Sequence, residues 1–182
     1  VSVVNALAEW CWVEVSRNNE VHRQEYKRGI PQGDVKKVGK TKESGTKTCF
    51  MADHEVFTRV DFKFDILASR MRELAFLNKG LKLILIDHKI DKKLEFHYKG
   101  GLAAFVEYLN ENKNVLYNKP IYFQKEKEGT DVEIAIQYND GYVENLFSYV
   151  NNINTIEGGS QLTGFRTALT RTVNNYITKT GL

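Results

Sequence analysis

The first fifty residues alternate between apolar and polar positions in the manner of half-buried β-strands. Asn18-Asn19 supplies a turn between the first strand and the returning one, and a polar loop separates the last two. Residues 2–9, which precede the alternation, read as the end of a helix. The pattern therefore predicts a helix end followed by four strands, over 11–15, 21–27, 34–39 and 46–51.

The middle of the chain changes to the period of an α-helix. Its apolar stripe consists of Phe64, Leu67, Met71, Leu74 and Ala75. Gly80 lies just beyond the predicted end of this helix. The apolar run over 81–87 predicts a buried strand, with its partner over 94–98. Gly100-Gly101 then interrupts the pattern and is interpreted as a domain boundary.

Helical and strand patterns alternate again after that boundary. A second helical stripe consists of Leu102, Phe105, Val106 and Leu109. Alternation over 132–138 predicts a strand with one exposed face, and the turn at Asp140-Gly141 predicts that 142–150 pairs back with it. A long amphipathic helix follows, with Leu162, Phe165, Leu169, Val173 and Tyr176 on one face. The predicted fold class is α+β in two parts, residues 1–100 and 101–182.

Composition narrows the class of protein without identifying it. The 182 residues are 42% hydrophobic and 27% charged, which is ordinary for a globular protein. No apolar run approaches the roughly 18–20 residues that cross a bilayer. Residues 1–100 carry 19 lysines and arginines against 14 acidic residues, a net charge of +5, whereas residues 101–182 carry 7 against 9, a net charge of −2. Any contact with nucleic acid is therefore expected to be local.

The residue types that usually carry catalysis form no recognisable pattern. Cys11 and Cys49 are isolated from each other, which fits a reducing compartment better than a disulfide framework. The four histidines show no metal-ligand spacing. The sequence contains no P-loop, no complete phosphate-binding glycine loop and no serine-centred elbow. The cluster Asp53-His54-Glu55 is expected to be a solvated loop.

A series of motifs along the chain nevertheless resembles one family. The motifs are VSVVNAL at 1–7, HRQEYKRGIP at 22–31, SGTKTCF at 44–50, RELAFLNKGL at 72–81, GGLAAFVEYLNENK at 100–113, VNNINTIEGG at 150–159 and GFRTALTR at 164–171. In this order they resemble the B subunits of bacterial DNA gyrase, type IIA topoisomerases whose ATPase fold is shared with histidine kinases and MutL. Because the series covers nearly the whole chain, it is far more specific than any single motif.

The resemblance implies both a fold and a function. Residues 1–100 would be the C-terminal part of a gyrase-type ATPase α/β sandwich. Residues 101–182 would be most of a transducer domain, a ribosomal-protein-like α/β fold with a left-handed βαβ crossover. The implied function is part of an ATP-operated gate that couples ATP binding and hydrolysis to DNA strand passage and negative supercoiling.

Two alternatives stay open. One is the B subunit of topoisomerase IV, which would decatenate DNA, although the runs FLNKGL and VNNINT favour gyrase. The other is a non-enzymatic nucleic-acid-binding module. That reading requires a basic face on residues 101–182, and the net charge of −2 argues against it.

The resemblance assigns five residues to the nucleotide site. Val1 and Ser2 match positions that follow the phosphate-loop glycines, where a helix N-terminus would favour an anion. Thr46 matches a threonine in the hydrogen-bond network around the adenine, and Thr48 occupies a position that is usually valine. Arg17 matches an arginine at the rim of the pocket, where aminocoumarin-type inhibitors bind. Without the resemblance, each would read as an ordinary strand, turn or helix residue.

The last helix carries the implied DNA contact. Arg166 matches an arginine that faces the cavity through which a DNA segment would pass, and a guanidinium suits phosphate because it stays charged. Without the family, an arginine beside an apolar stripe is as often a solvated side chain. Ser160-Gln161 departs from the Thr-His that usually follows the two glycines. Any role of that histidine is therefore in doubt here.

Most of the catalytic machinery is implied to lie outside this chain. By resemblance, the metal-binding asparagine, the glutamate general base and the adenine-binding aspartate precede Val1, and the lysine that reaches the γ-phosphate follows Leu182. ATP and Mg²⁺ are the cofactors implied for the complete protein. No catalytic or metal-binding residue is assigned within the chain, and the chain alone is expected not to hydrolyse ATP.

The partners implied are those of the complete topoisomerase. They are the gyrase A subunit, a second copy of the gyrase B subunit in an ATP-dependent dimer, and double-stranded DNA, with aminocoumarin-type inhibitors as further ligands. No membrane partner is expected. The expected location is the bacterial cytoplasm.

Overall fold

The computed structural model describes residues 1–181 and divides into two compact units, Val1–Lys63 and Phe64–Leu182. The mixture of helices and strands confirms the α+β class. The units separate at the loop before Phe64, whereas the boundary expected near residue 100 lies within the second unit. That boundary, which concerns ATPase and transducer domains, stays a prediction.

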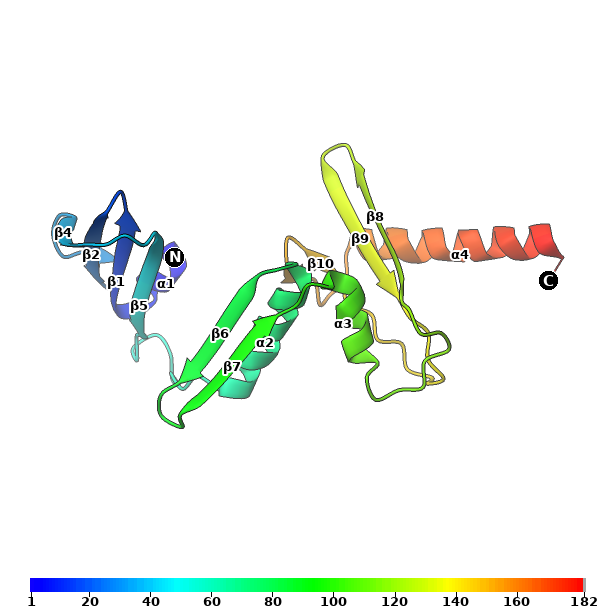
Figure 1. The fold of residues 1–182 in the computed structure, drawn as a ribbon, viewed down its shortest axis with the longest axis horizontal. Helices are drawn as coiled ribbons and strands as arrows, with labels where there is room; N and C mark the ends of the chain where they lie inside the picture. Colours follow the sequence, from blue (N-terminus) through cyan, green and yellow to red (C-terminus); the bar gives the residue numbers. More distant parts are fainter. Residues whose placement is uncertain (182) are drawn as a thin grey trace. The chain divides into compact units, whose positions relative to one another are not determined.

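The first unit is an antiparallel sheet that follows a short helix. Helix α1 (Ser2–Ala6) leads into strand β1 (Ala8–Arg17), which lies between β2 (Glu20–Lys27) and β5 (Gly45–Ala52), as Figure 1 shows. Strand β2 also pairs with β4 (Lys36–Lys40) and with β3 (Ile30–Pro31), which the sequence pattern did not predict. The β1–β2 turn places Asn18 and Asn19 at φ values of 55° and 63°, a conformation that asparagine tolerates well.

One acidic residue after β5 is structural, contrary to the expected solvated loop. Asp53 is 4% exposed, and its carboxylate accepts a bond from the Nε of Arg28 at 2.8 Å and from the backbone N–H of Glu55 at 2.9 Å. Its own N–H donates to the carbonyl of Leu7 at 3.1 Å. Asp53 therefore ties the end of β5 to the helix–strand connection at the start of the chain, and the buried carboxylate is satisfied by these partners.

The second unit begins with a helix packed on a two-stranded sheet. Helix α2 (Phe64–Leu77) covers one face of the antiparallel pair β6 (Lys82–Asp87) and β7 (Lys92–His97) (Figure 1). Ala68, Ala75 and Phe96 form the buried core between them. The other face is open, since Ile84 and Ile86 are nearly half exposed. The expectation that 81–87 is a buried strand is therefore wrong.

Aromatic packing joins α2 to the next helix, α3 (Gly101–Leu109). The ring of Phe76 stacks on Tyr98 with centroids 3.6 Å apart and on Phe105 with centroids 5.2 Å apart. Gly101 has a φ of 60°, and a Cβ there would lie 2.2 Å from the Cε of Lys79. The positive φ of Gly101, together with its close approach to the side chain of Lys79, therefore favours glycine at the start of α3.

The hairpin that follows α3 differs from the prediction. Strand β8 (Ile121–Lys127) pairs with β9 (Thr130–Ile136) across a turn in which Glu128 and Gly129 have φ values of 51° and 74°. The predicted pairing of β9 with 142–150 is wrong. A two-residue turn with glycine in second position connects twisted strands directly, so β9 takes the preceding strand as its partner.

The last elements are a hairpin with two residues in each strand and a long helix. Strands β10 (Tyr149–Val150) and β11 (Ile153–Asn154) flank a turn at Asn151-Asn152. Helix α4 (Ser160–Thr180) follows, as the stripe predicted. None of its described side chains is buried, however, and Val173, Tyr176 and Ile177 are all more than 40% exposed. The left-handed crossover implied for this region stays a prediction.

Candidate functional site

Strand register in the first unit brings together residues that are far apart in sequence. Val13 lies opposite Thr48, and Val15 lies opposite Thr46, in the antiparallel pairing of β1 with β5. Directly opposed residues share a face of the sheet, and alternate residues of one strand do so as well. The two threonines therefore sit on the same face as the two valines. The sheet presents them as an exposed patch of methyl groups and hydroxyls.

The neighbouring strand extends this face. Arg17 lies opposite Glu20, Val15 opposite His22 and Val13 opposite Gln24. These β1 and β2 residues line a hollow of about 550 Å³ together with Val1, Asn18, Tyr26 and Val35. We call this surface, which includes Thr46 and Thr48, the β1 odd-residue face. His22 and Gln24 were not singled out in the sequence, although their register with the valines could have identified them.

The five assigned residues are placed unequally. Val1 and Arg17 line the hollow, whereas Thr46 and Thr48 lie on the same face without lining it. Ser2 is exposed on α1 and does not line the hollow. The hydroxyls of Thr46 and Thr48 can both donate and accept hydrogen bonds, and the valines offer apolar contact. This combination suits a flat heterocycle with a polar edge, so the residues present fit an adenine group.

The opposite face of the same sheet is chemically different. Trp12 lies beneath two cations, with the guanidinium of Arg23 4.3 Å and the ammonium of Lys47 5.3 Å from the ring centroid. Glu14 pairs with Arg23 at 3.3 Å. Cation–π contacts and ion pairs cover part of this side with charge, while Trp10 and Met51, which lie opposite each other on it, are 37% and 42% exposed. The hollow of about 550 Å³ lies on the β1 odd-residue face.

Charge at the rim of the hollow is set by local pairs. A hydrogen bond from the ammonium of Lys37 is the main cause that holds the pKa of Glu20 below its usual value. Glu20 therefore stays a carboxylate beside the strand partner Arg17 at neutral pH. The rim carries both signs of charge, and the Arg17 guanidinium is the permanent cation available to an anionic ligand.

A second polar surface lies on α4. Arg166 is 56% exposed, and its guanidinium donates to the carboxylate of Glu144 at 2.7 Å. It lines a shallow hollow along the helix with Thr167, Thr170, Arg171, Asn174 and Asn175. Exposed ion pairs are weak and screened by salt, so a phosphate could compete with Glu144 for Arg166. This surface is a candidate for a polyanion contact.

Within residues 1–181, no group of three or more His, Cys, Asp or Glu side chains is arranged to hold a metal ion. Cys11 and Cys49 are free thiols. Among the helices of that region, none is both long and apolar enough to cross a membrane.

Two solved structures that share this fold are both gyrase B proteins. The 43K ATPase domain of Thermus thermophilus gyrase B, in complex with an aminocoumarin, aligns with a TM-score of 0.85 and 37% identity over 99% of this chain and 50% of that one. The gyrase B subunit from Myxococcus xanthus aligns with a TM-score of 0.83 and 26% identity over 91% and 49%. The fold is therefore that of gyrase-type ATPase regions.

Sequence comparisons give the family. The family model for DNA gyrase B matches residues 101–182. The DNA gyrase B subunit of Clostridium acetobutylicum is 51% identical over 181 residues, which is 99% of this chain, and that of Halalkalibacterium halodurans is 50% identical over 183 residues. The chain belongs to the DNA gyrase B family. It spans 28% and 29% of the length of these two relatives.

Proposed function

We propose that this chain forms part of the ATP-operated gate of DNA gyrase, in which ATP binding and hydrolysis are coupled to DNA strand passage and negative supercoiling. The observation that carries the proposal is the β1 odd-residue face, where the residues that the resemblance assigns to the adenine pocket gather. The similarity to gyrase B relatives over nearly the whole chain supports it.

Different residues of this surface would contact different parts of the nucleotide. Thr46 would hydrogen-bond at the edge of the adenine, while Thr48, Val13 and Val15 would contact its apolar surface. Arg17 would face the rim, where an aminocoumarin-type inhibitor would also bind. Val1 and Ser2 would adjoin the phosphates. ATP, when bound with Mg²⁺, would supply the free energy of hydrolysis, and this chain's residues would orient the base.

Hydrolysis requires groups that the resemblance places outside residues 1–182. We therefore propose that the chain alone does not hydrolyse ATP. The expected result is no Mg²⁺-dependent phosphate release above background from the purified chain. Measurable release that disappears in Thr46→Ala would contradict this, and it would move the catalytic groups into the chain itself.

The transducer half would carry the change of state to DNA. Arg166 would contact phosphate on a DNA segment enclosed by the dimer, with Glu144 as its partner in the absence of DNA. The gyrase A subunit and a second copy of the gyrase B subunit would complete the enzyme. A bacterial cytoplasm remains the proposed location.

The test is a topoisomerase assay on the complete gyrase B protein together with its gyrase A partner. ATP-dependent supercoiling of relaxed circular DNA is expected, with Thr46→Ala reducing it more than tenfold, because a buried hydrogen bond at the base would be lost. Lys42→Ala, an exposed lysine in the loop before β5, is the matched control. Decatenation without supercoiling would assign the chain to topoisomerase IV, and neither activity with retained DNA binding would leave a binding module.

A further inference from the structure

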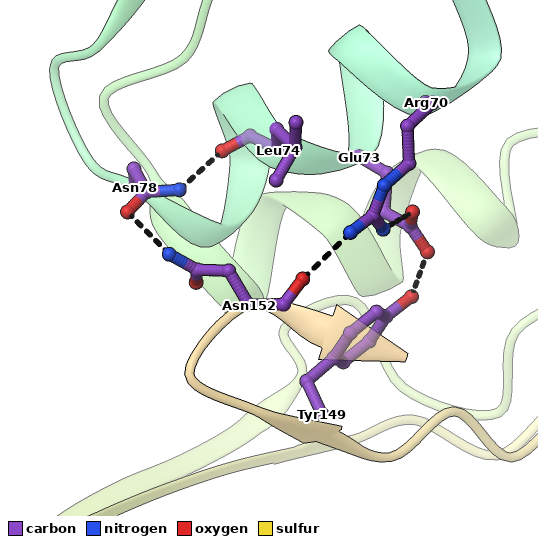
Figure 2. A network of polar contacts seen from close by, with 6 residues as sticks. All are labelled: Arg70, Glu73, Leu74, Asn78, Tyr149 and Asn152. Atoms are coloured by element: carbon purple, nitrogen blue, oxygen red, sulfur yellow. Dashed lines mark hydrogen bonds and ion pairs between the residues drawn. The ribbon is translucent and has the colours of Figure 1, made fainter. Parts of the chain in front are cut away.

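A hydrogen-bonded network joins α2 to the β10–β11 hairpin, which is more than 70 residues away in sequence (Figure 2). The phenol of Tyr149 donates to the carboxylate of Glu73, and Arg70 forms an ion pair with the same carboxylate. A second guanidinium nitrogen of Arg70 donates to the backbone carbonyl of Asn152 at 2.7 Å. Because Glu73 is largely buried, its negative charge needs partners, and Tyr149 and Arg70 provide them.

The turn of the hairpin continues the network. The side-chain amide of Asn152 donates to the Oδ1 of Asn78 at 3.0 Å, and the amide of Asn78 donates to the carbonyl of Leu74 at 2.8 Å. Asn151 and Asn152 have φ values of 49° and 66°, which presents the carbonyl of Asn152 to α2. A hairpin with two residues in each strand is too short to be stable alone. Its position therefore depends on α2.

The hairpin in turn holds the first turn of α4. Thr155 closes the hairpin, with its N–H donating to the carbonyl of Ser148 at 2.8 Å. The amide of Gln161 donates to the Oγ1 of Thr155 at 3.1 Å and to the Oγ of Ser148 at 3.3 Å. Gln161, which the resemblance matches to a position that is usually histidine, contacts the base of the hairpin here.

Little else fixes the direction of α4. Gly158 and Gly159, which connect the hairpin to the helix, have φ values of 85° and 144°, a backbone region that glycine enters freely. No described side chain of α4 is buried. The helix start is therefore controlled by the hairpin and by Gln161, and Arg166 lies less than two turns beyond Gln161.

We propose that Tyr149 and Gln161 are positioning residues: the α2–hairpin network and the Gln161 contacts form a latch that orients α4 and Arg166 relative to α2. This inference rests on the proposed gate function for its activity readout. The latch connects a helix of the segment assigned to the ATPase half with the helix proposed to contact DNA. Weakening it is expected to uncouple ATP hydrolysis from strand passage while both partial activities persist.

The test compares Tyr149→Phe and Gln161→Ala with the control Tyr142→Phe, a fully exposed tyrosine before the hairpin. In the complete gyrase B protein with its gyrase A partner, each latch variant is expected to hydrolyse ATP within about twofold of wild type. The number of supercoils introduced per ATP is expected to fall about tenfold in Tyr149→Phe, the factor that a lost bond to a charged group can supply. The fall is expected to be smaller in Gln161→Ala, which loses bonds to neutral hydroxyls. Tyr142→Phe is expected to change neither quantity.

Hydrogen exchange supplies a readout that does not depend on enzyme activity. Amides of 149–155 and of 160–166 are expected to exchange about tenfold faster in Tyr149→Phe than in Tyr142→Phe, with α2 amides near Phe76 unchanged. Unchanged exchange and unchanged supercoils per ATP would overturn the latch. If wild type fails to supercoil DNA, the gate function is wrong, and exchange alone then decides the latch. If Tyr149→Phe fails to fold, exposed Gln161→Ala decides in its place.

Discussion

Helices α2 and α4 are both amphipathic, but α2 buries side chains of its apolar face within its unit and α4 does not. Helix α2 buries Ala68, Ala75 and Phe76 against β6–β7 and α3. Helix α4 is seven residues longer, 21 against 14, and none of its described side chains is buried. An apolar stripe therefore predicts that a helix forms and which face is apolar, but it does not identify what covers that face.

The largest expected effect is a difference in the free energy of unfolding between a core substitution in α2 and a stripe substitution in α4. Phe76→Ala removes a ring that is 2% exposed and stacked on two others, and large-to-small changes of this kind cost about 3–5 kcal/mol. Phe165→Ala in the stripe of α4 is expected to cost about 1 kcal/mol or less. Urea unfolding of the two variants measures the difference. Equal losses would mean that α4 packs as tightly as α2.

The next effect concerns the contact between α2 and the hairpin. Tyr149→Phe is expected to destabilise the second unit by about 1–3 kcal/mol, because a hydrogen bond to a buried carboxylate is lost. The same Tyr-to-Phe substitution at Tyr176 in α4 is the control, because that side chain is 61% exposed. A cost below that of the control would show that Glu73 finds another donor without loss.

The pH dependence of stability gives a second measure of the contact between Tyr149 and α2. Burial, reinforced by the Glu73 hydrogen bond, raises the pKa of Tyr149 well above its ordinary value of 10.0. The unfolded chain therefore ionises first, and this contribution to stability is complete below about pH 10 and is lost as the pH rises toward the folded-state pKa. Wild type should lose stability faster than Tyr149→Phe as the pH rises above about 10. Parallel denaturation curves would contradict the burial of this phenol.

The smallest expected effect lies on the surface of α4. Glu144→Gln removes the partner of Arg166, and an exposed pair of this kind contributes about 0–1 kcal/mol. The expected change in stability is therefore close to the error of measurement. Binding of duplex DNA by the complete gyrase B protein should instead strengthen slightly at low salt, because Arg166 is freed for phosphate. Weaker binding in Glu144→Gln would argue against Arg166 as a phosphate contact.

What the sequence predicted depended on whether the signal was local. The turn at Asn18-Asn19, the stripes of α2 and α3 and the strand β9 follow from spacing within about ten residues, and all are present. The partner of β9 was predicted wrongly because Asp140-Gly141 outweighed the less obvious turn at Glu128-Gly129. Periodicity carries no information on which of two neighbouring turns closes a hairpin.

The candidate site shows the same limit. Thr46, Thr48 and Arg17 could be assigned only through the family resemblance, since each is an ordinary residue in its strand or turn. Their shared face with Val13, Val15 and His22 requires the register of three strands, in which Val13 and Thr48 pair although they are 35 residues apart. The network around Glu73 joins segments even further apart, so no sequence pattern indicated Tyr149, and Gln161 was noted only as a departure from the family motif.

The two thiols of the first sheet differ in accessibility, so a fluorescence probe can be attached to one of them selectively. Cys11 is buried, and burial raises the pKa of its thiol, so it reacts slowly with a maleimide. Cys49 is only half-buried and lies opposite Trp12, on the face away from the proposed nucleotide pocket. A dye attached there would quench the indole fluorescence and report bending of the sheet without occupying the site.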